Sequence, residues 1–308
     1  MTRILITGAS GLLGLNFAMQ FYSQHTLTGV VHSNILAGAP FPVIQADLSQ
    51  PGIMEEILDQ VRPEVVLHCA ALANVDACEH QPELAWQVNA ELPGRLAAAS
   101  ARDGFHLVHL STDAVFDGQH GDYSEEDEPN PLSTYARTKL AGERKVFEAN
   151  PAALVARVNF YGWSLSGRRS LGEFFVTNLS AGRQVNGFTD VVFCPLEATL
   201  LGEVFLRLVE LEAGGLLHVV SSEWQSKYDF GCAVAAQFGL DDGLIRPVSV
   251  AEGGLLAARS PDLRLRTDRL AGFLGRPAPG QAECLQRFYD LYQSGYPLRL
   301  RQLAGQDG

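Results

Sequence analysis

The stretch TGASGLLG, residues 7–14, decides the fold of this chain. It follows a short apolar run, residues 4–6, that predicts a buried strand, and it precedes residues 15–21, which predict a helix. A strand, a glycine-rich turn and a helix N-terminus together form a site for a phosphate anion, because backbone N–H groups and the helix dipole both favour negative charge there. The glycines are spaced GxxGxxG rather than GxGxxG. Directly after the first strand, they favour a dinucleotide-binding turn over a purely structural one.

Similar apolar runs follow along the chain at residues 65–71 and 105–110. They are continuous rather than alternating, and helical stretches separate them, which is typical of a parallel sheet covered by helices on both faces. We therefore expect an α/β fold with a doubly wound parallel sheet of the Rossmann type. In such sheets, ligands bind beyond the carboxyl ends of the strands. Gly8, Ala70 and Thr112 are expected to lie at those ends.

The composition limits the partners that the chain can have. Its 308 residues carry a formal net charge of −12, which argues against nucleic acid or an anionic membrane surface as a partner. The five cysteines are scattered without the spacing of a zinc site or a disulfide framework, so we expect no metal and a reducing compartment. No apolar run of about 18 residues predicts a transmembrane helix. A cytoplasmic protein is the expectation.

The residues after the second predicted strand, Val30-Val31, bear on the choice between NAD and NADP. An acidic residue here would accept a hydrogen bond from the 2′-hydroxyl of NAD. The chain has His32 and Ser33 instead, which leaves room for a 2′-phosphate, although no arginine is placed to bind one. We expect NADPH as the cofactor, with NADH possible. Farther along, Asp47 either caps the segment that follows it or accepts from the adenine amino group.

Tyr135 and Lys139 lie four residues apart in a stretch, residues 133–143, that predicts a helix. Side chains at this spacing leave the same face of a helix about 6 Å apart, as they also do on ordinary surface helices. Carbonyl reduction needs a proton for the oxygen, and a lysine cation beside a phenol lowers the phenol's pKa from its usual value of about 10. We therefore expect Tyr135 to donate the proton, Lys139 to lower its pKa, and Thr112 to hold the substrate oxygen.

Four motifs in this order resemble those of the extended short-chain dehydrogenase/reductase family: TGASGLLG (7–14), HCAALANVD (68–76), STDAVFDG (111–118) and YARTK (135–139). Within that family, the chain most resembles the dTDP-4-dehydrorhamnose reductases, and SEWQSKYDF (222–230) is similar to the same branch. The resemblance covers most of the chain. It implies an NAD(P)H-dependent reductase of a 4-keto nucleotide sugar, with a smaller mixed α/β C-terminal substrate domain beside the Rossmann domain.

The resemblance also implies which residues form the site. The catalytic residues are expected to be Thr112, Tyr135 and Lys139. The cofactor is expected to contact Gly8, Ser10, Gly11, Leu12, Leu13, Gly14, His32, Ser33, Asp47, Leu48, Cys69, Ala70, Ala71, Asn89, Ser111, Tyr135, Lys139 and Asn159. The substrate is expected to contact Val115, Phe116, Tyr135, Trp163 and Arg168.

Two other functions stay open. Family members that dehydrate sugar nucleotides carry a glutamate base where this chain has Ala114, so a dehydratase is disfavoured. A nucleotide-sugar epimerase needs no extra residue at that position. A non-catalytic NADP-binding regulatory protein, similar to the regulatory subunit of methionine adenosyltransferase, can keep the same side chains. Departures from the family pattern at Ala114 and at residues 190–197 leave the substrate itself undecided.

The resemblance implies a division into two domains. Residues 1–160 are expected to form the dinucleotide-binding domain, which residues 190–222 rejoin. The substrate domain is expected to comprise residues 161–189 and 223–308.

Two helical stretches are expected to form a homodimer interface. Residues 82–102 predict one long helix with Asn89 inside it, where an asparagine needs either solvent or a buried hydrogen bond. Together with residues 131–149, this stretch matches the helices that typically build a four-helix interface in the family.

Overall fold

The centre of the molecule is a parallel sheet of seven strands in the order β11-β6-β5-β4-β1-β2-β3. The computed structural model describes residues 1–252 and 260–304. The strand order reverses between β1 and β4, and this switch point is where open α/β sheets form their binding crevice. The predicted Rossmann fold is confirmed. The strands are β1 (Arg3–Thr7), β2 (Thr26–Val31), β3 (Val43–Gln45), β4 (Val65–His68), β5 (His106–Thr112), β6 (Leu154–Val158) and β11 (Gly215–Val219).

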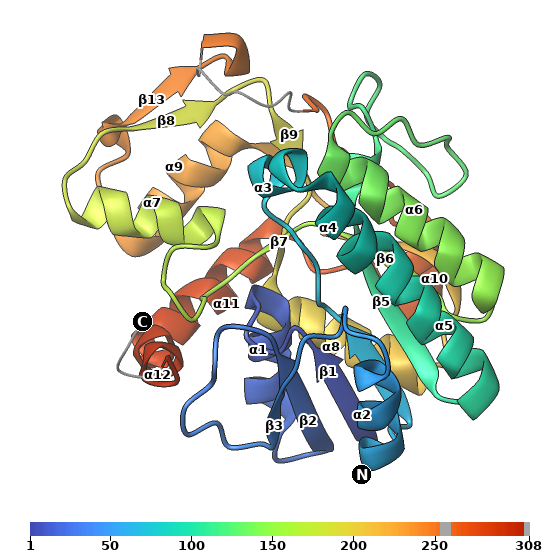
Figure 1. Cartoon of the computed structure of the whole chain (residues 1–308). Coiled ribbons are helices and arrows are strands. Elements are labelled where there is room, and N and C mark those ends of the chain that lie inside the picture. The colour runs from blue at the N-terminus through green and yellow to red at the C-terminus, as the bar shows by residue number, and fades with distance from the viewer. Residues whose placement is uncertain (253–259, 305–308) are drawn as a thin grey trace.

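Helices cover both faces of the sheet (Figure 1). Neighbouring strand residues point to opposite faces, so Ile4 and Ile6 belong to one hydrophobic cluster and Leu5 to another. The first cluster includes side chains of α1 and α8, and the second includes side chains of α2, α5 and α6. These helices are α1 (Leu12–Phe21), α2 (Ile53–Val61), α5 (Leu92–Asp103), α6 (Thr134–Ala149) and α8 (Ala198–Glu210).

The helical stretch predicted at residues 82–102 is present, and it contains a π-helical turn that was not predicted. It consists of α4 (Pro82–Trp86), a π-helical turn (Gln87–Glu91) and α5. Asn89 lies in the π turn, where its buried side chain bonds both backbone groups of Leu72 at 2.9 and 3.1 Å. Such single π turns are often found at functional sites. Here the turn fixes the segment that follows β4.

The C-terminal elements form a smaller part, seen at the upper left of Figure 1 where α7, α9, β8 and β13 stand together. β8 pairs with β13 in parallel, and β9 pairs with β12 antiparallel. β10, which leads directly into α8, pairs with β7 in parallel. The remaining elements are α3 (Val75–His80), β7 (Phe160–Tyr161), α7 (Leu171–Ser180), β8 (Val185–Phe188), β9 (Val192–Phe193), β10 (Leu196–Glu197), β12 (Gln225–Ser226), α9 (Lys227–Phe238), β13 (Ile245–Val248), α10 (Asp268–Leu274), α11 (Gln281–Gln293) and α12 (Tyr296–Gln302).

Two features of the fold bear on the expected domains, and a third concerns membranes. β11 lies beside β6 as the last strand of the main sheet. Parts of the expected substrate domain, residues 253–259 and 305–308, lie outside the described residues. In the two described ranges, no helix is both long and apolar enough to cross a membrane.

Candidate active site

The glycine turn packs tightly against the end of the neighbouring strand. Gly8 has φ +67°, and a Cβ there would lie 2.8 Å from the backbone nitrogen of Ala70. A Cβ on Gly14 would lie 2.6 Å from the carbonyl oxygen of Gly8. Glycine is therefore required at both positions. Helix α1 begins directly after the turn, and its N-cap, Gly11, has no side chain to occupy the first N–H groups. This cradle fits a pyrophosphate.

The three residues expected to be catalytic come together at the carboxyl edge of the sheet. Ser133 caps α6 by accepting from the backbone of Ala136, so Tyr135 lies in the first turn of the helix. Thr112 ends β5, and its hydroxyl group hydrogen-bonds the Tyr135 phenol. The Lys139 side chain is 3% exposed, and its Nζ donates to the carbonyl oxygen of β5 residue 110 at 2.5 Å. The charge of Lys139 also acts on the pKa values of His68 and Cys69, so its ammonium group lies near the end of β4.

The electrostatics of this group correct one expectation. Burial raises the pKa of Tyr135 to about 12, an effect that outweighs the opposing hydrogen bond from Thr112. The predicted lowering by Lys139 is not found. Burial lowers the pKa of Lys139 itself to about 8, whereas Glu143 and Cys69 act to raise it. The reason is that both groups lose solvent, and desolvation always disfavours the charged form.

Asp113 is a buried acid for which the sequence predicted no role. It directly follows Thr112, is 4% exposed, and accepts hydrogen bonds from Asn159 Nδ2 at 2.5 Å and from the Thr112 hydroxyl group at 3.2 Å. Burial raises its pKa, and these hydrogen bonds oppose the rise. The amide of Asn159, expected at the cofactor, is thus engaged with Asp113. Its place directly after Thr112, the hydroxyl residue at the end of a strand, was the feature of the sequence that could have pointed to it.

Three residues expected to touch the substrate are core residues here. Val115 and Phe116 are 0% exposed, and Trp163 is 5% exposed. The Trp163 indole stacks on Phe288 with ring centroids 4.2 Å apart, and its Nε1 donates to the Phe288 carbonyl oxygen. Their side chains have no free face for a sugar, so we leave them out of the proposed site. Aromatic residues near a site are as often part of its packing as of its lining.

The residues expected at the adenosine end are exposed or have structural partners. His32 and Ser33 are exposed. Asp47 accepts from the backbone and hydroxyl groups of Ser49 at 3.0 and 2.6 Å and from Gln50, which lowers its pKa. Those bonds form the turn after β3, whereas the N-cap of α2 is Gly52, so Asp47 stabilises this turn and does not cap the helix. Leu48 beside it is 9% exposed.

The other expected cofactor residues follow the same two strand ends. Ala70 donates its N–H to Thr7 Oγ1 at 3.2 Å, and the thiol of Cys69 has a pKa raised to about 12 by burial. Ser10, Leu12 and Ala71 are partly buried or exposed, and Leu13 is buried. Arg168 is exposed, in the loop between β7 and α7. The hydroxyl of Ser111 points under α6, where it donates to Glu143.

A buried polar layer beneath α6 was not anticipated. His68 and His109 pair in register on β4 and β5, and their rings stack with centroids 5.3 Å apart. Nearby, Arg157 of β6 forms an ion pair with Glu143 of α6 at 2.8 Å. Two features of the sequence could have indicated this polar layer. Arg157 is a charge inside an apolar strand, and Glu143 is one turn beyond Lys139.

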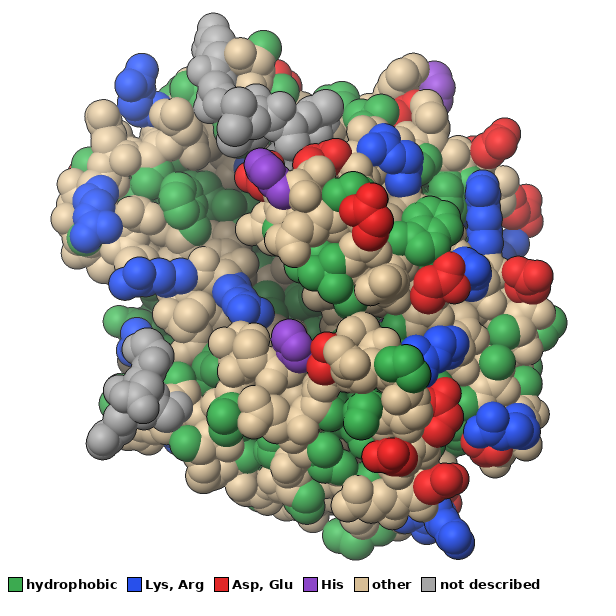
Figure 2. Space-filling view, viewed as in Figure 1, with side chains coloured by type: hydrophobic (Ala, Val, Ile, Leu, Met, Phe, Trp, Pro, Cys, Tyr) green, Lys and Arg blue, Asp and Glu red, His purple; other side chains and the backbone are tan. Residues whose placement is uncertain are grey.

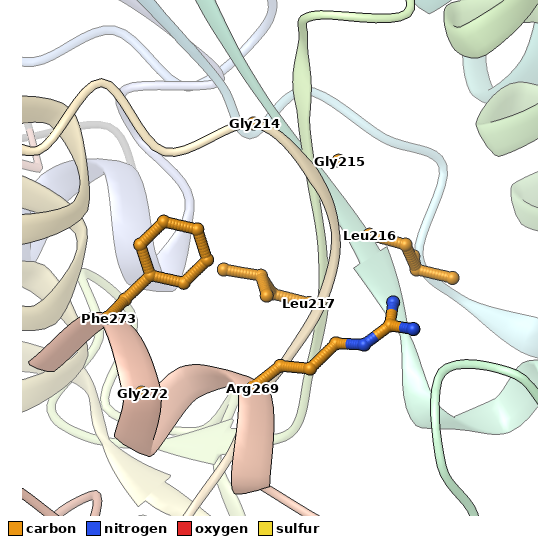
Figure 3. Close-up of a pocket in the computed structure, with 7 residues that line it drawn as sticks. All are labelled: Gly214, Gly215, Leu216, Leu217, Arg269, Gly272 and Phe273. Atoms are coloured by element: carbon orange, nitrogen blue, oxygen red, sulfur yellow. The ribbon is translucent and has the colours of Figure 1, made fainter.

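Figure 2 shows a depression between the smaller C-terminal part and the rest of the molecule, with hydrophobic side chains in its floor and basic side chains on its margin. A separate open pocket of about 450 Å³ lies beside α10, at the amino end of β11 (Figure 3). Its charged lining residue, Arg269, pairs with Glu126 at 2.9 Å. Ligands of open α/β sheets bind at the opposite, carboxyl ends, so this pocket is outside the candidate site.

Three relatives resemble the chain over most of their length. It is 35% identical to a probable low-salt glycan biosynthesis reductase, Agl14, of Haloferax volcanii, over 89% of this chain and 93% of the relative. It is 35% identical to the dTDP-4-dehydrorhamnose reductase of Mycobacterium tuberculosis, over 84% and 83%. It is 33% identical to methionine adenosyltransferase 2 subunit beta of Pongo abelii, over 84% and 78%.

Solved structures and a family model agree with these relatives. A hypothetical dTDP-4-dehydrorhamnose reductase from Sulfolobus tokodaii superposes with a TM-score of 0.80 at 30% identity, covering 90% of this chain and 96% of that one. The Bacillus anthracis dTDP-4-dehydrorhamnose reductase, solved with NADP, shares the fold with a TM-score of 0.83 at 24% identity, over 94% and 99%. The model of the RmlD substrate binding domain matches residues 1–294. The chain therefore belongs to the RmlD substrate-binding domain family of extended short-chain dehydrogenases/reductases.

Proposed function

We propose that this protein is an NAD(P)H-dependent reductase of a 4-keto nucleotide sugar, similar to dTDP-4-dehydrorhamnose reductase. The observation that carries the proposal is the meeting of Thr112, Tyr135 and Lys139 at the carboxyl edge of the sheet, next to the glycine turn. The relatives that are named as reductases support it.

Gly8, Gly11 and Gly14, with the open N-terminus of α1, are the residues that would hold the cofactor's pyrophosphate. When bound, NADPH supplies a hydride for the carbonyl carbon. NADPH is favoured because no acid follows β2 at His32 and because a related structure contains NADP. NADH remains compatible with the same cradle.

Tyr135 donates its phenolic proton to the carbonyl oxygen of the substrate. Its raised pKa keeps it protonated through the neutral range, which suits a proton donor but makes the phenolate that forms costly. Lys139, one turn along α6, does not lower the pKa of the phenol in the protein without cofactor. We propose that it offsets the cost of the phenolate only in the cofactor-bound protein, as a cation near the phenol. Thr112 lies beside Tyr135 and gives its one hydroxyl proton to Asp113 at 3.2 Å. It would hold the substrate oxygen in line with the phenol by turning that proton from Asp113 toward the substrate.

The test is consumption of NADPH with a 4-keto nucleotide sugar such as dTDP-4-dehydrorhamnose. Tyr135→Phe should lower turnover by about a hundred-fold or more while NADPH still binds, because only the proton donor is removed. Tyr292→Phe, which changes an exposed tyrosine, is the matched control and should leave turnover unchanged. Wild-type turnover by Tyr135→Phe would show that another group is the acid.

A regulatory role is the second candidate, because the beta subunit of methionine adenosyltransferase 2 is 33% identical. The complete set of Thr112, Tyr135 and Lys139 favours catalysis over that role. NADPH binding without turnover on a broad panel of nucleotide sugars would support regulation. Interconversion of epimers without net NADPH consumption would instead indicate an epimerase.

We further propose a cytoplasmic homodimer that forms through residues 82–102 and 131–149. Exposed apolar side chains on or beside these helices, Leu84, Trp86 and Leu132, support such an interface. The net charge of −12 favours neither nucleic acid nor an anionic membrane as a partner. Light scattering at micromolar concentration should give the mass of a dimer, and a monomer would contradict the proposal.

A further inference from the structure

Consecutive residues at the end of β5 are each held by a side chain of α6. Lys139 Nζ donates to the carbonyl oxygen of Leu110. The hydroxyl group of Ser111 donates to the carboxylate of Glu143. Thr112, the next residue, hydrogen-bonds the phenol at the start of the same helix. Two of these three contacts belong to the proposed catalytic set, and the contact between them belongs to Glu143.

Glu143 is locked from its other side by Arg157. Arg157 Nε donates to Glu143 Oε1 at 3.0 Å, and Nη2 donates to Oε2 at 2.8 Å. Both side chains are at most 4% exposed. The guanidinium also contacts His218 Nε2 at 3.5 Å and lies over the Phe116 ring at 4.9 Å. A bidentate pair with this many contacts has one orientation, so it fixes Glu143 relative to β5 and β6.

We propose that Glu143 is a positioning residue for Lys139: it lies one turn farther along α6 on the same face, and its carboxylate, oriented by Arg157 and Ser111, joins α6 to β5 and places a negative charge beside the lysine. The inference rests on the proposed reductase function for its kinetic consequence. Its electrostatic part concerns the protein alone and is tested separately.

Glu143 is the anionic group that favours the charged form of Lys139, because the other titratable groups that act on the lysine are neutral. On β4 and β5, His68 and His109 are neutral, because burial lowers the pKa of His68 to about 3 and that of His109 well below its usual range. After β4, the Cys69 thiol stays protonated, since burial raises its pKa to about 12. Within α6, Glu143 opposes the desolvation that lowers the pKa of Lys139.

The chain allows a direct measurement, because it has three lysines, Lys139, Lys145 and Lys227. Protein made with 13C-labelled lysine gives three side-chain signals, and Lys139→Arg identifies one of them by its loss. The pKa of Lys139, about 8 in the wild type, should fall by about one pH unit in Glu143→Gln, because a nearby anion has been replaced by an amide. Glu210→Gln, which breaks an exposed ion pair with Arg207, should leave it unchanged.

A second variant separates charge from folding. In Glu143→Gln/Arg157→Gln no charge of the pair remains, and the two amides can still hydrogen-bond, so this variant keeps the test available if Glu143→Gln alone does not fold. The pKa of Lys139 should be lowered here too, but by less than in the single variant, because the guanidinium whose positive charge opposed that of Glu143 is also removed. A wild-type pKa in either variant would overturn the proposal and reduce the pair to a structural role. Ser111→Ala, which removes one bond to Glu143, should lower it less.

The kinetic readout depends on the proposed reaction. Reductive turnover should fall as the pH rises through the pKa of Lys139, which gives the pH–rate profile a descending limb on its alkaline side. In both glutamine variants this limb should move to lower pH by the shift measured for the lysine. Turnover below that limb should change much less. A shifted lysine signal with an unshifted kinetic limb would retain the electrostatic inference and contradict the role of Lys139 in the reaction. The two failures are therefore distinguishable.

Discussion

Two buried glutamates in this protein differ in what compensates their charge. Glu143 lies between α6 and β6, and both of its oxygens accept hydrogen bonds from Arg157. Glu197 lies at the N-cap of α8 and is 0% exposed. Its Oε2 accepts from the backbone of Thr199 and Leu200 at 2.7 and 3.2 Å, whereas its Oε1 has no partner among the described residues.

The difference shows two ways of placing a carboxyl group in a protein core. Glu143 has Arg157 as its ion-pair partner beside the proposed active site. Burial raises the pKa of Glu197 to about 7, an effect that the bonds from the start of α8 reduce. The neighbouring hydroxyl groups of Tyr161 and Tyr296 are also buried without partners in the described chain. Glu197 is therefore expected to change its protonation near neutral pH.

Removing the partner of Glu143 should have the largest effect on stability. Arg157→Leu leaves a carboxylate in the core without its counterion, and we expect a loss of about 3–5 kcal/mol in the free energy of unfolding. Urea denaturation at pH 7 measures it. Arg207→Leu breaks an exposed pair with Glu210 and should cost no more than about 1 kcal/mol. Equal losses in the two variants would contradict the comparison, and adding Glu143→Leu to Arg157→Leu should recover much of the loss.

Glu197→Gln should have the next largest effect, and the effect should depend on pH. A carboxyl group whose pKa is raised on folding binds more protons in the native state, so its contribution falls as the pH rises from about 4.5 to about 7. The total is about 3 kcal/mol by linkage. Glutamine can still accept from the start of α8 but carries no charge. The variant should match the wild type near pH 4.5 and be more stable above pH 7.

Urea denaturation across pH 4.5–8 tests this expectation. Glu148→Gln on the exposed side of α6 is the control and should leave the pH dependence of the wild type intact. A variant that loses stability equally at every pH would mean that the carboxylate acts only as a cap for α8.

The fold and the clustering of Thr112, Tyr135 and Lys139 could be predicted because their signals are local. The glycine turn at residues 7–14 and the continuous apolar runs each specify a strand end without reference to the rest of the chain. The spacing of Tyr135 and Lys139 specifies one face of a helix. Packing α6 against β5 then brings Thr112 to them, because the strand ends of a parallel sheet share one edge.

The remaining features depend on contacts between distant segments. Asn89 distorts its helix because Leu72 offers backbone groups to it, and no local pattern predicts that. Glu143 and Arg157 find each other only once β6 lies beneath α6. Phe116 is an aromatic near the site that became core because Tyr123 stacks on it at 4.1 Å. Desolvation of Tyr135, which reversed the expected direction of its pKa, is likewise a property of the folded chain.

The smallest expected effect tests whether Glu197 is truly uncompensated. The Tyr161 hydroxyl group lies buried near it, among Phe230 and Phe288. Because this hydroxyl group has no partner among the residues that the structure describes, Tyr161→Phe should be neutral or stabilising by up to about 1 kcal/mol at both pH 5 and pH 8. Tyr292→Phe at an exposed position is the control. A loss confined to pH 8 would mean that the phenol donates to Glu197 once that carboxyl group ionises, and the two glutamates would then differ only in the kind of partner that compensates them.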